Sequence, residues 1–365
     1  MITEYIYTMK KVIIIIFSFF VAFKNVYAIS ASSYVVMDSD TNNVLMGSNI
    51  HSDRLIASIS KIMTCIIAIE NGDLDEYVTA DKSILKGVGS SIYIEIGEKI
   101  KLKDLLYGMM LRSGNDAAIL IANTIAGDMQ KFSQMMNEYA KKIGMSNTYF
   151  YNSHGLEEDN GLGNTSSAYD MALLTSYAMQ NKTFKEIFAT KNYVAKSDKK
   201  TYSWQNKNKL LKYDYITGGK TGYTQKARRT LVTTASIDNM NLIIVTLNDG
   251  NDWNDHLALY ESVKNKYQSI KIISKNDFEI LDDTVYVNDN LYIENDVRLT
   301  LTKADIPNLK IKYYLVNKKK YKTKEKIGNA TIYLNDKLLY TEPIYIEAEA
   351  NKNKNFLKRL IDKIF

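Results

Sequence analysis

The sequence predicts an α/β protein with an antiparallel sheet, followed by a small all-β module and a C-terminal amphipathic helix. Strand patterns stand at both ends of residues 29–269, with helical patterns between them. Short alternating segments then follow as far as residue 350, and residues 351–365 place apolar side chains at helical spacing. The 365 residues are enough for one large domain and one smaller one.

The elements of the first part are predicted in a definite order. Residues 34–37 and 44–46 flank a turn-rich stretch and predict a β-hairpin. Apolar residues recur at helical spacing in five segments: 62–69, 104–110, 116–125, 132–142 and 168–179. Two strands, 230–236 and 242–247, and a closing helix at 253–266 complete a domain that we assign to residues 29–269.

The second part changes character from residue 270 onward. Six short alternating segments are separated by Asn, Asp and Lys turns: 284–287, 291–293, 297–301, 310–315, 330–334 and 344–346. This pattern predicts a small all-β domain over residues 270–350, and it contains no catalytic constellation.

The N-terminus has the pattern of a secretory signal. Lys10 and Lys11 precede an apolar run at 12–23, and Ala28 closes a small-residue cleavage site. The apolar run is too short for a comfortable transmembrane helix, although an uncleaved anchor is the alternative. Met9 is an alternative start. We therefore expect residues 1–28 to be a signal peptide and the protein to work outside the cytoplasm, at the membrane or in the cell wall.

The chain's net charge of +6 lies at its two ends, because residues 1–28 carry +2 and residues 351–365 carry +4. In residues 351–365 the apolar side chains share the helix with lysines and an arginine, which is typical of a helix that lies on an anionic membrane surface. A self-packing terminal helix is the alternative. The neutral body gives no indication of nucleic-acid binding.

The composition excludes several classes of site. A single cysteine, Cys65, rules out an intrachain disulfide framework and any cysteine-based zinc site. The three histidines, His51, His154 and His256, are scattered and form no zinc-binding motif. We therefore expect no metal.

A first motif, Ser58-Ile59-Ser60-Lys61, has the spacing of a serine nucleophile and a lysine base. Ser58 directly precedes the apolar run of a predicted helix, and Lys61 lies one turn further along the same face. A serine hydroxyl needs a base to become a nucleophile, and a neutral lysine amine in a dry, cation-lined pocket can serve. The helix N-terminus also favours negative charge nearby.

The same spacing recurs at 83–86 and at 197–200. The segment at 83–86 runs straight into Gly87 and Gly89, and the segment at 197–200 lies in a charged loop. Taken alone, even the first motif is better explained by a helix cap and a surface lysine. The order and context of three motifs separate it from these two.

The second motif is Ser113-Gly114-Asn115, in a break between two helical patterns. Ser113 offers a hydroxyl that can relay protons, and Asn115 offers both a donor and an acceptor to a peptide backbone. A plain helix N-cap is the alternative, and a similar triplet at 274–276 shows how often the pattern occurs by chance.

The third motif is Lys220-Thr221-Gly222, at the head of a segment that ends in a predicted strand. Gly222 removes a side chain where a substrate backbone would approach closely. The backbone N–H groups of Tyr223 and Ser58 are then candidates for an oxyanion hole. A glycine-rich turn before a strand is the alternative.

His154, followed by Gly155 and Leu156, is a further candidate base. No carboxylate is placed by a motif to orient its ring, so we interpret it as structural or as flanking the substrate.

Together the motifs resemble the penicilloyl-serine transferases, and specifically the low-molecular-mass penicillin-binding proteins that are D-alanyl-D-alanine carboxypeptidases. The resemblance covers nearly the whole chain and is carried by residues 55–64, 111–118, 154–156 and 217–224. It implies a transpeptidase/β-lactamase-like catalytic domain, followed by the β module and tail found in that family.

The resemblance also implies a reaction. Ser58 resembles the acylated nucleophile, Lys61 its general base and Ser113 the proton relay. The terminal D-Ala of peptidoglycan pentapeptides would leave, and water would resolve the acyl-enzyme, without metal or organic cofactor. The expected partners are peptidoglycan peptide stems, β-lactams as inhibitors, and a membrane surface, in a role in cell-wall or spore-wall maturation.

The substrate-binding residues are implied in the same way. Asn115 resembles the residue that binds the substrate backbone, Lys220 would supply positive potential, and Thr221 would help to hold the terminal carboxylate. Either Arg228 or Arg229 would add charge, and no motif decides between them.

Three other functions stay open on the sequence. An endopeptidase that cuts peptide crosslinks shares every motif, and a penicillin-binding sensor or wall-binding protein would be acylated without turnover. Ser60, where family members often have threonine, is a mild departure. Gly114 argues against a class A β-lactamase, which carries Asp in the second motif and a loop glutamate for deacylation.

Overall fold

The computed structural model describes residues 28–280, 286, 290–317, 321–322 and 324–347. Residues 1–27 of the predicted signal peptide, the C-terminal amphipathic helix and most of the segment 284–287 therefore lie outside the described residues. Within the described ranges no helix is long and apolar enough to cross a membrane.

A five-stranded antiparallel sheet forms the base of the larger part, in the order β2-β1-β11-β10-β9. Its strands are β1 (Ser33–Asp38), β2 (Val44–Ser48), β9 (Ile216–Thr224), β10 (Arg228–Ile237) and β11 (Met240–Asp249). Asp238 and Asn239 join β10 to β11 with positive φ angles of 50° and 63°, as a tight two-residue hairpin turn requires. β9 lies at an edge of this sheet, so one of its sides pairs with no other strand of the described residues.

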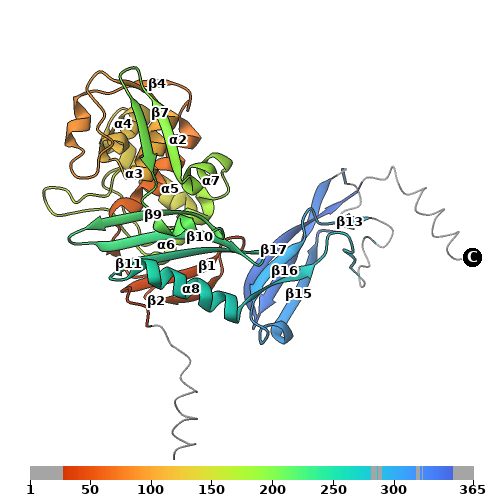
Figure 1. Ribbon diagram of the computed structural model, residues 1–365. Helices are drawn as coiled ribbons and strands as arrows, with labels where there is room; N and C mark the ends of the chain where they lie inside the picture. The colour runs from red at the N-terminus through yellow and green to blue at the C-terminus, as the bar shows by residue number, and fades with distance from the viewer. Residues whose placement is uncertain (1–27, 281–285, 287–289, 318–320, 323, 348–365) are drawn as a thin grey trace, which may run out of the picture.

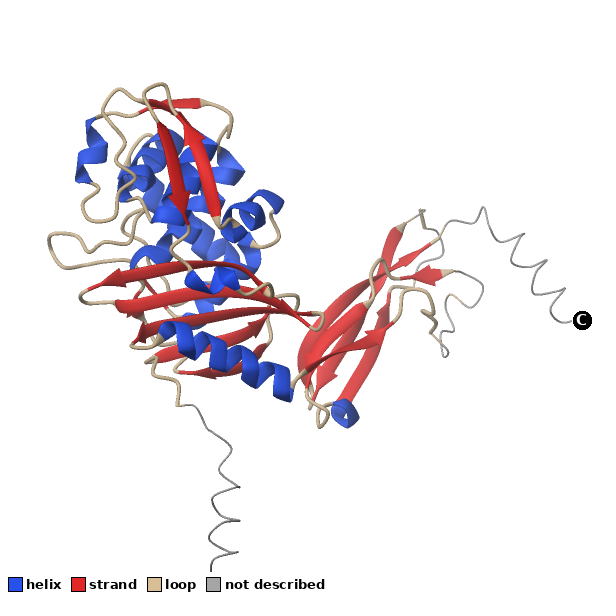
Figure 2. Ribbon diagram, viewed as in Figure 1, coloured by secondary structure: helices blue, strands red, loops and turns tan. Residues whose placement is uncertain are grey.

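Helices cover both faces of this sheet (Figure 1, Figure 2). One face carries α2 (Lys61–Asn71), α3 (Leu102–Arg112), α4 (Asn115–Ala126), α5 (Met129–Ile143), α6 (Ala168–Ala178) and α7 (Lys182–Ala189). The other face carries α8 (Asp252–Lys266). Side chains alternate along the central strands, so Val232 packs with the helical layer while Leu231 packs beneath α8.

Three small two-stranded sheets surround the helices. They pair β3 (Arg54–Leu55) with β6 (Thr165–Ser166), β4 (Tyr77–Thr79) with β5 (Lys99–Lys101), and β7 (Asn192–Lys196) with β8 (Thr201–Gln205). The sequence analysis did not predict these sheets or α7. Their strands are too short, or too polar on the outer face, to give a clear period of two.

The second part is all-β and has its own apolar core. A four-stranded sheet contains β13 (Leu291–Tyr292), β17 (Lys337–Ile346), β16 (Glu325–Leu334) and β15 (Leu309–Leu315), and a separate pair joins β12 (Gln268–Ile273) to β14 (Val297–Leu301). It lies beside the sheet of the larger part (Figure 1), where Asn43 Nδ2 donates to the Leu339 carbonyl at 3.2 Å. The predicted fold class is confirmed for both parts, and the domain boundaries stay a prediction.

Candidate active site

Ser58 lies in a short 3₁₀ helix, Ala57–Ser60, that leads directly into α2. The sequence analysis expected it in the first turn of the α-helix. The difference arises at Ala57, whose φ of 50° lies in the left-handed region and bends the chain just before the serine. The Ser60 hydroxyl donates to the Ala57 carbonyl at 2.7 Å and closes this turn. Ser58 remains partly exposed while its neighbours are buried, as a nucleophile requires.

Gly155 holds a second segment against the turn that contains Ser58. Its φ is +88°, and a Cβ added there would lie 2.0 Å from the Ala57 carbonyl oxygen. Only glycine therefore allows residues 152–156 to approach so closely. This approach brings the His154 carbonyl onto the amine of Lys61.

Replacing Gly155 by alanine should therefore displace the Ala57 carbonyl and the serine that follows it. We expect Gly155→Ala to destabilise the protein by about 2 kcal/mol or more, since strain in φ adds to the overlap with backbone. Chemical denaturation measures this loss of stability. In the fraction of Gly155→Ala that remains folded, the rate of β-lactam acylation should also fall. Gly144→Ala is the control, because Gly144 has a φ of +89° but open space around its Cβ position. Equal effects of the two substitutions would contradict the close approach as the cause.

The amine of Lys61 is buried and contacts three oxygen atoms. Its Nζ lies 3.0 Å from Ser58 Oγ, 2.7 Å from Asn115 Oδ1 and 2.6 Å from the His154 carbonyl. The last two atoms can only accept hydrogen bonds. A neutral amine has two hydrogens and one lone pair, so it can donate to both acceptors and direct its lone pair at the Ser58 hydroxyl.

The surroundings of Lys61 favour this neutral form. Burial is the main cause that lowers the pKa of Lys61 well below its usual value, and the nearby charges of Lys220 and Lys207 lower it further. Asp116 opposes them only weakly. Its carboxylate is directed at the backbone N–H groups of residues 92, 94 and 117, which it holds in place. The site is thus rich in cations, and among the described residues no carboxylate contacts the Lys61 amine, which favours its uncharged form.

Ser113 and Lys220 form a second serine–lysine pair. Ser113 ends α3 with a left-handed φ of 64°, and its hydroxyl lies 3.0 Å from Lys220 Nζ. Lys220 also donates to the Thr221 carbonyl at 2.8 Å. Burial, together with the charge of Lys207, lowers the pKa of Lys220 to about 7. Both predicted lysines therefore lie in the same site, and each has a pKa below its usual value.

Asn115 connects Lys61 to the loop that precedes α3. Its Oδ1 accepts from Lys61, and its Nδ2 donates to the Val88 carbonyl at 2.6 Å. An amide nitrogen carries two hydrogens, so one remains to donate to a substrate carbonyl.

The middle of β9 passes directly beside Ser58. A Cβ added to Gly222 would lie 2.9 Å from the Ser58 backbone nitrogen and 2.4 Å from Thr230 Oγ1. Thr221 is partly exposed and Tyr223 is 59% exposed on the edge strand. The structure therefore brings all three motifs together, and it places the Gly222–Tyr223 peptide beside the amide of Ser58.

The two arginines of β10 differ in their surroundings. Arg229 pairs in register with Tyr223, and its Nε donates to Asp252 on α8 at 3.0 Å. Arg228 pairs with Thr224 and has a left-handed φ of 60°, so strand alternation does not fix the direction of its side chain. Which of the two arginines adds charge at the site stays a prediction.

His154 contributes its backbone rather than its ring to the contacts with Lys61. Its Nδ1 accepts from the Leu156 backbone N–H at 3.1 Å, and burial lowers the pKa of His154 to about 3. The ring is therefore neutral at physiological pH and cannot take up a proton there.

We expect His154→Asn to keep kcat/KM within about 10-fold of the parent, because an asparagine oxygen can accept the same N–H two residues along. The pH dependence of kcat/KM should be unchanged between pH 5 and 8. A loss of several orders of magnitude, or a new pH limb, would show that the ring acts as a base.

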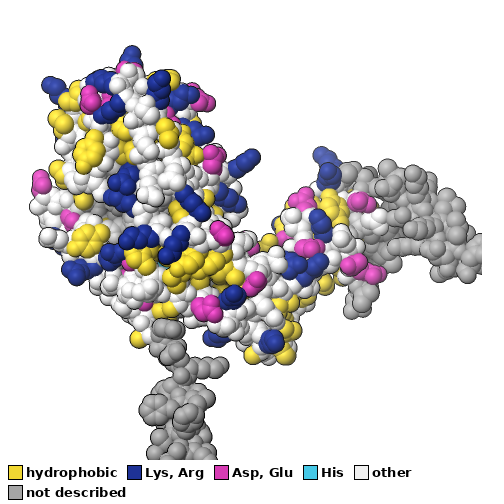
Figure 3. Space-filling model, viewed as in Figure 1, with side chains coloured by type: hydrophobic (Ala, Val, Ile, Leu, Met, Phe, Trp, Pro, Cys, Tyr) yellow, Lys and Arg dark blue, Asp and Glu magenta, His cyan; other side chains and the backbone are white. Residues whose placement is uncertain are grey.

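No sequence motif indicates Lys207, whose charge acts on both Lys61 and Lys220. Lys207 Nζ donates to Ser90 Oγ at 3.0 Å, and its charge lowers the pKa of Lys61 and of Lys220. It stands among other lysines in a polar loop, and no motif marks it. Figure 3 shows lysine and arginine side chains over the middle of the body, where an anionic group would be attracted. Within the described part of the chain no group of residues is arranged to hold a metal ion.

Comparison with known proteins identifies the family to which this chain belongs. Residues 21–251 match the family model described as D-alanyl-D-alanine carboxypeptidase, and residues 267–352 match the C-terminal domain of penicillin-binding protein 5. The D-alanyl-D-alanine carboxypeptidase DacD of Salmonella typhimurium is 30% identical over 360 residues, covering 92% of this chain and 90% of its own length. DacF of Bacillus subtilis is 35% identical over 223 residues, which span 59% of this chain and 56% of that protein.

Solved structures give the same result. The crystal structure of penicillin-binding protein 5 from Haemophilus influenzae matches with a TM-score of 0.71 at 25% identity, covering 88% of this chain and 97% of that one. The chain belongs to the D-alanyl-D-alanine carboxypeptidase family of serine peptidases. It is a low-molecular-mass penicillin-binding protein with serine-type D-alanyl-D-alanine carboxypeptidase activity.

Proposed function

We propose that Ser58 is the nucleophile of this carboxypeptidase and that Lys61, as a neutral amine, is its base. The three contacts of Lys61 Nζ carry this proposal. Two of them use up the N–H groups of a neutral amine, so the lone pair is left for the Ser58 hydroxyl.

In the acylation step the Ser58 oxygen attacks the carbonyl carbon of the penultimate D-Ala while its proton passes to Lys61. The carbonyl oxygen becomes an oxyanion, for which the N–H groups of Ser58 and Tyr223 are the proposed donors. The close approach of Gly222 to the Ser58 nitrogen supports this pairing, since no side chain lies between them.

The C–N bond then breaks, and the leaving amine of the terminal D-Ala needs a proton. The Ser113 hydroxyl, 3.0 Å from Lys220 Nζ, is the proposed relay: it gives its proton to the amine and takes up the proton that Lys61 received from Ser58. Water then attacks the ester at Ser58 while Lys61, neutral again, accepts a proton from the water. Lys61 returns this proton to the Ser58 oxygen as the shortened peptide is released.

Substrate binding would use the edge of β9 and the cations around it. Lys220 and Lys207 attract the terminal carboxylate, and Thr221 and one of the two β10 arginines, Arg228 or Arg229, would bind it. The second N–H of the Asn115 amide would donate to a backbone carbonyl of the peptide stem. β-Lactams would acylate Ser58 through the same contacts.

Export and membrane attachment complete the proposal. The pattern of residues 1–28 supports secretion, and the basic amphipathic pattern of residues 351–365 supports attachment to an anionic membrane surface. The substrate, peptidoglycan, lies in the compartment that these segments would reach.

The experiment is a direct comparison of two peptide substrates. The purified protein should release D-alanine from an acyl-D-Ala-D-Ala peptide, and Ser58→Ala should abolish release. Cleavage of a crosslinked muropeptide dimer at a higher rate would favour an endopeptidase instead. Stable acylation by penicillin without release of D-alanine would favour a sensor, and release that persists in Ser58→Ala would reject the nucleophile.

A further inference from the structure

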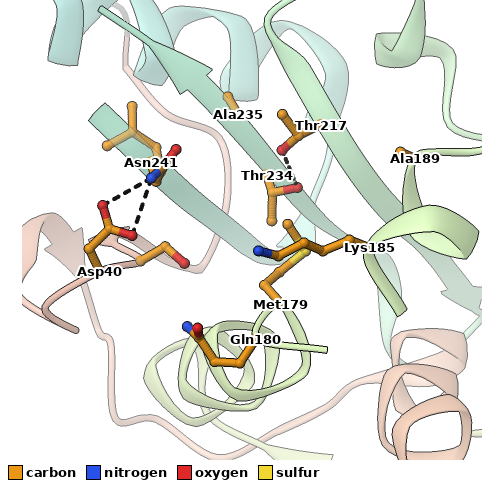
Figure 4. Close-up of a pocket in the computed structure, with 11 residues that line it drawn as sticks. Asp40, Met179, Gln180, Lys185, Ala189, Thr217, Thr234, Ala235 and Asn241 are labelled. Atoms are coloured by element: carbon orange, nitrogen blue, oxygen red, sulfur yellow. Dashed lines mark hydrogen bonds between the residues drawn. The ribbon is translucent and has the colours of Figure 1, made fainter. Parts of the chain in front are cut away.

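A cavity of about 400 Å³ lies on the helical face of the sheet, and Ser58 is not among the residues that line it. It is bounded by the turn after β1, the end of α6, helix α7, and the ends of β9, β10 and β11 that meet there (Figure 4). None of the three catalytic motifs lines it. Along β9 its nearest residue, Thr217, precedes Lys220 by three residues, or about 10 Å of strand.

Two side chains of opposite charge, Asp40 and Lys185, line the cavity but form no ion pair with each other. Asp40 and Lys185 reach toward it from different segments (Figure 4). Asp40 is oriented by the Asn241 amide, whose Nδ2 lies 3.2 and 3.0 Å from its two oxygens. Lys185 forms no ion pair within 4.0 Å in the described part of the chain. An unpaired cation and an oriented carboxylate around one cavity suit a ligand that carries both charges.

A hydroxyl pair supplies a further donor. The register between β9 and β10 shifts by one residue at Thr217, and this bulge turns the Thr217 hydroxyl toward Thr234, to which it donates at 2.8 Å. The Thr234 hydroxyl then still has its own hydrogen, and no acceptor for it occurs among the described residues. It is available to a ligand carboxylate beside Lys185.

The remaining wall of the cavity is apolar, and part of it is a helix that packs tightly on β9. Met179, Ala189 and Leu242 line it, which suits a short aliphatic side chain. Helix α7 is fixed on β9, because a Cβ on Gly218 would lie only 2.3 Å from the ring of Phe188. The cavity is therefore bounded by an element that packs directly on the strand carrying Lys220.

We infer that this cavity is a second binding site for a small zwitterion of amino-acid or dipeptide size, whose ammonium group pairs with Asp40 and whose carboxylate pairs with Lys185 and Thr234. The product of the reaction, D-alanine, belongs to this class. The inference depends on the proposed function only for the choice of D-alanine as the probe, since the charges and the cavity are independent of Ser58.

Equilibrium dialysis of the full chain with labelled D-alanine tests it, with excess β-lactam present throughout to keep the catalytic site filled. We expect saturable binding at one site with a dissociation constant of about 1 mM, as suits so small a ligand. Lys185→Gln and Asp40→Asn should each weaken binding at least about 10-fold. Lys182→Gln, on the same helix but outside the cavity, should leave it unchanged. N-acetyl-D-alanine and D-alaninamide, which each lack one charge, should compete poorly.

Several results would overturn the inference. They are the absence of saturable binding up to about 50 mM, equal binding by the parent and Lys185→Gln, or equal competition by the singly charged analogues. Binding that is lost in Lys220→Gln and kept in Lys185→Gln would assign the ligand to the catalytic site instead. The D-alanine release assay is separate, so a failure of the proposed function would be recognised independently.

Discussion

Lys61→Met should lower the rate of β-lactam acylation and of D-alanine release by about 10³-fold or more. Methionine has nearly the shape of lysine but no lone pair that can accept the Ser58 proton at neutral pH. The Asn115 oxygen and the His154 carbonyl also lose their donor, so the serine would be both less activated and less well positioned. Stopped-flow acylation with a chromogenic β-lactam measures the effect.

The matched control is Lys86→Met, which removes the lysine from the second segment with the same spacing. Lys86 is exposed, and Ser83 in that segment accepts from Asn123 rather than from a lysine. We expect this variant to react like the parent protein. Thermal unfolding of both variants establishes that they are folded, and a folded Lys61→Met that acylates within about 10-fold of the parent would exclude Lys61 as the base.

Lys220→Gln should lower kcat/KM for a peptide with a free terminal carboxylate by roughly 100-fold, because a charge-assisted contact in a buried site is lost. For a substrate whose terminal carboxylate is replaced by an amide, the same substitution should lower kcat/KM much less. Lys264→Gln, an exposed lysine on α8 across the sheet, is the control. Equal losses for the acid and the amide would show that Lys220 does not act on the carboxylate.

The pH dependence gives this variant a second signature. The charge of Lys220 is, after burial, the largest cause that lowers the pKa of Lys61. A base with a lowered pKa is active above that pKa and is lost as the pH falls through it. Removing the charge should therefore raise the pKa of Lys61 and move the acid limb of kcat/KM to higher pH.

Lys220→Gln should also affect the alkaline limb of kcat/KM, which it should remove rather than move. With a pKa of about 7, Lys220 carries its charge below that pH and loses it as the pH rises, so the parent enzyme should bind the carboxylate less well above pH 7. Lys220→Gln has no such charge to lose. Its kcat/KM should rise toward a plateau at high pH instead of falling, and a persisting alkaline limb near pH 7 would assign that limb to another group.

The longer helices, the hairpins of the main sheet and the three motifs could be predicted from the sequence because they are local properties. The apolar period placed α2 just after Ser58, and the break between α3 and α4 coincided with Ser113. The motifs then meet because β9 pairs with β10 at the edge of the sheet. The identity of that edge depends on strand order, which a single sequence does not reveal.

The features that the sequence could not predict depend on contacts between distant residues. Lys207 matters only because its loop folds back beside Ser90, more than 100 positions earlier in the chain. The left-handed φ of Ala57 is found where the segment around Gly155 packs directly against the Ala57 carbonyl. The contact of Arg229 with Asp252 likewise joins β10 to a residue on α8 that no motif indicates.

The most direct test of the central claim is to locate the covalent adduct. The protein is incubated with a β-lactam, digested with trypsin and analysed by tandem mass spectrometry. The proposed mechanism predicts one acyl group on Ser58, in the peptide 55–61, and none in Ser58→Ala. An adduct on Ser113, Ser83 or any other residue, or a folded protein that carries no adduct, would contradict it.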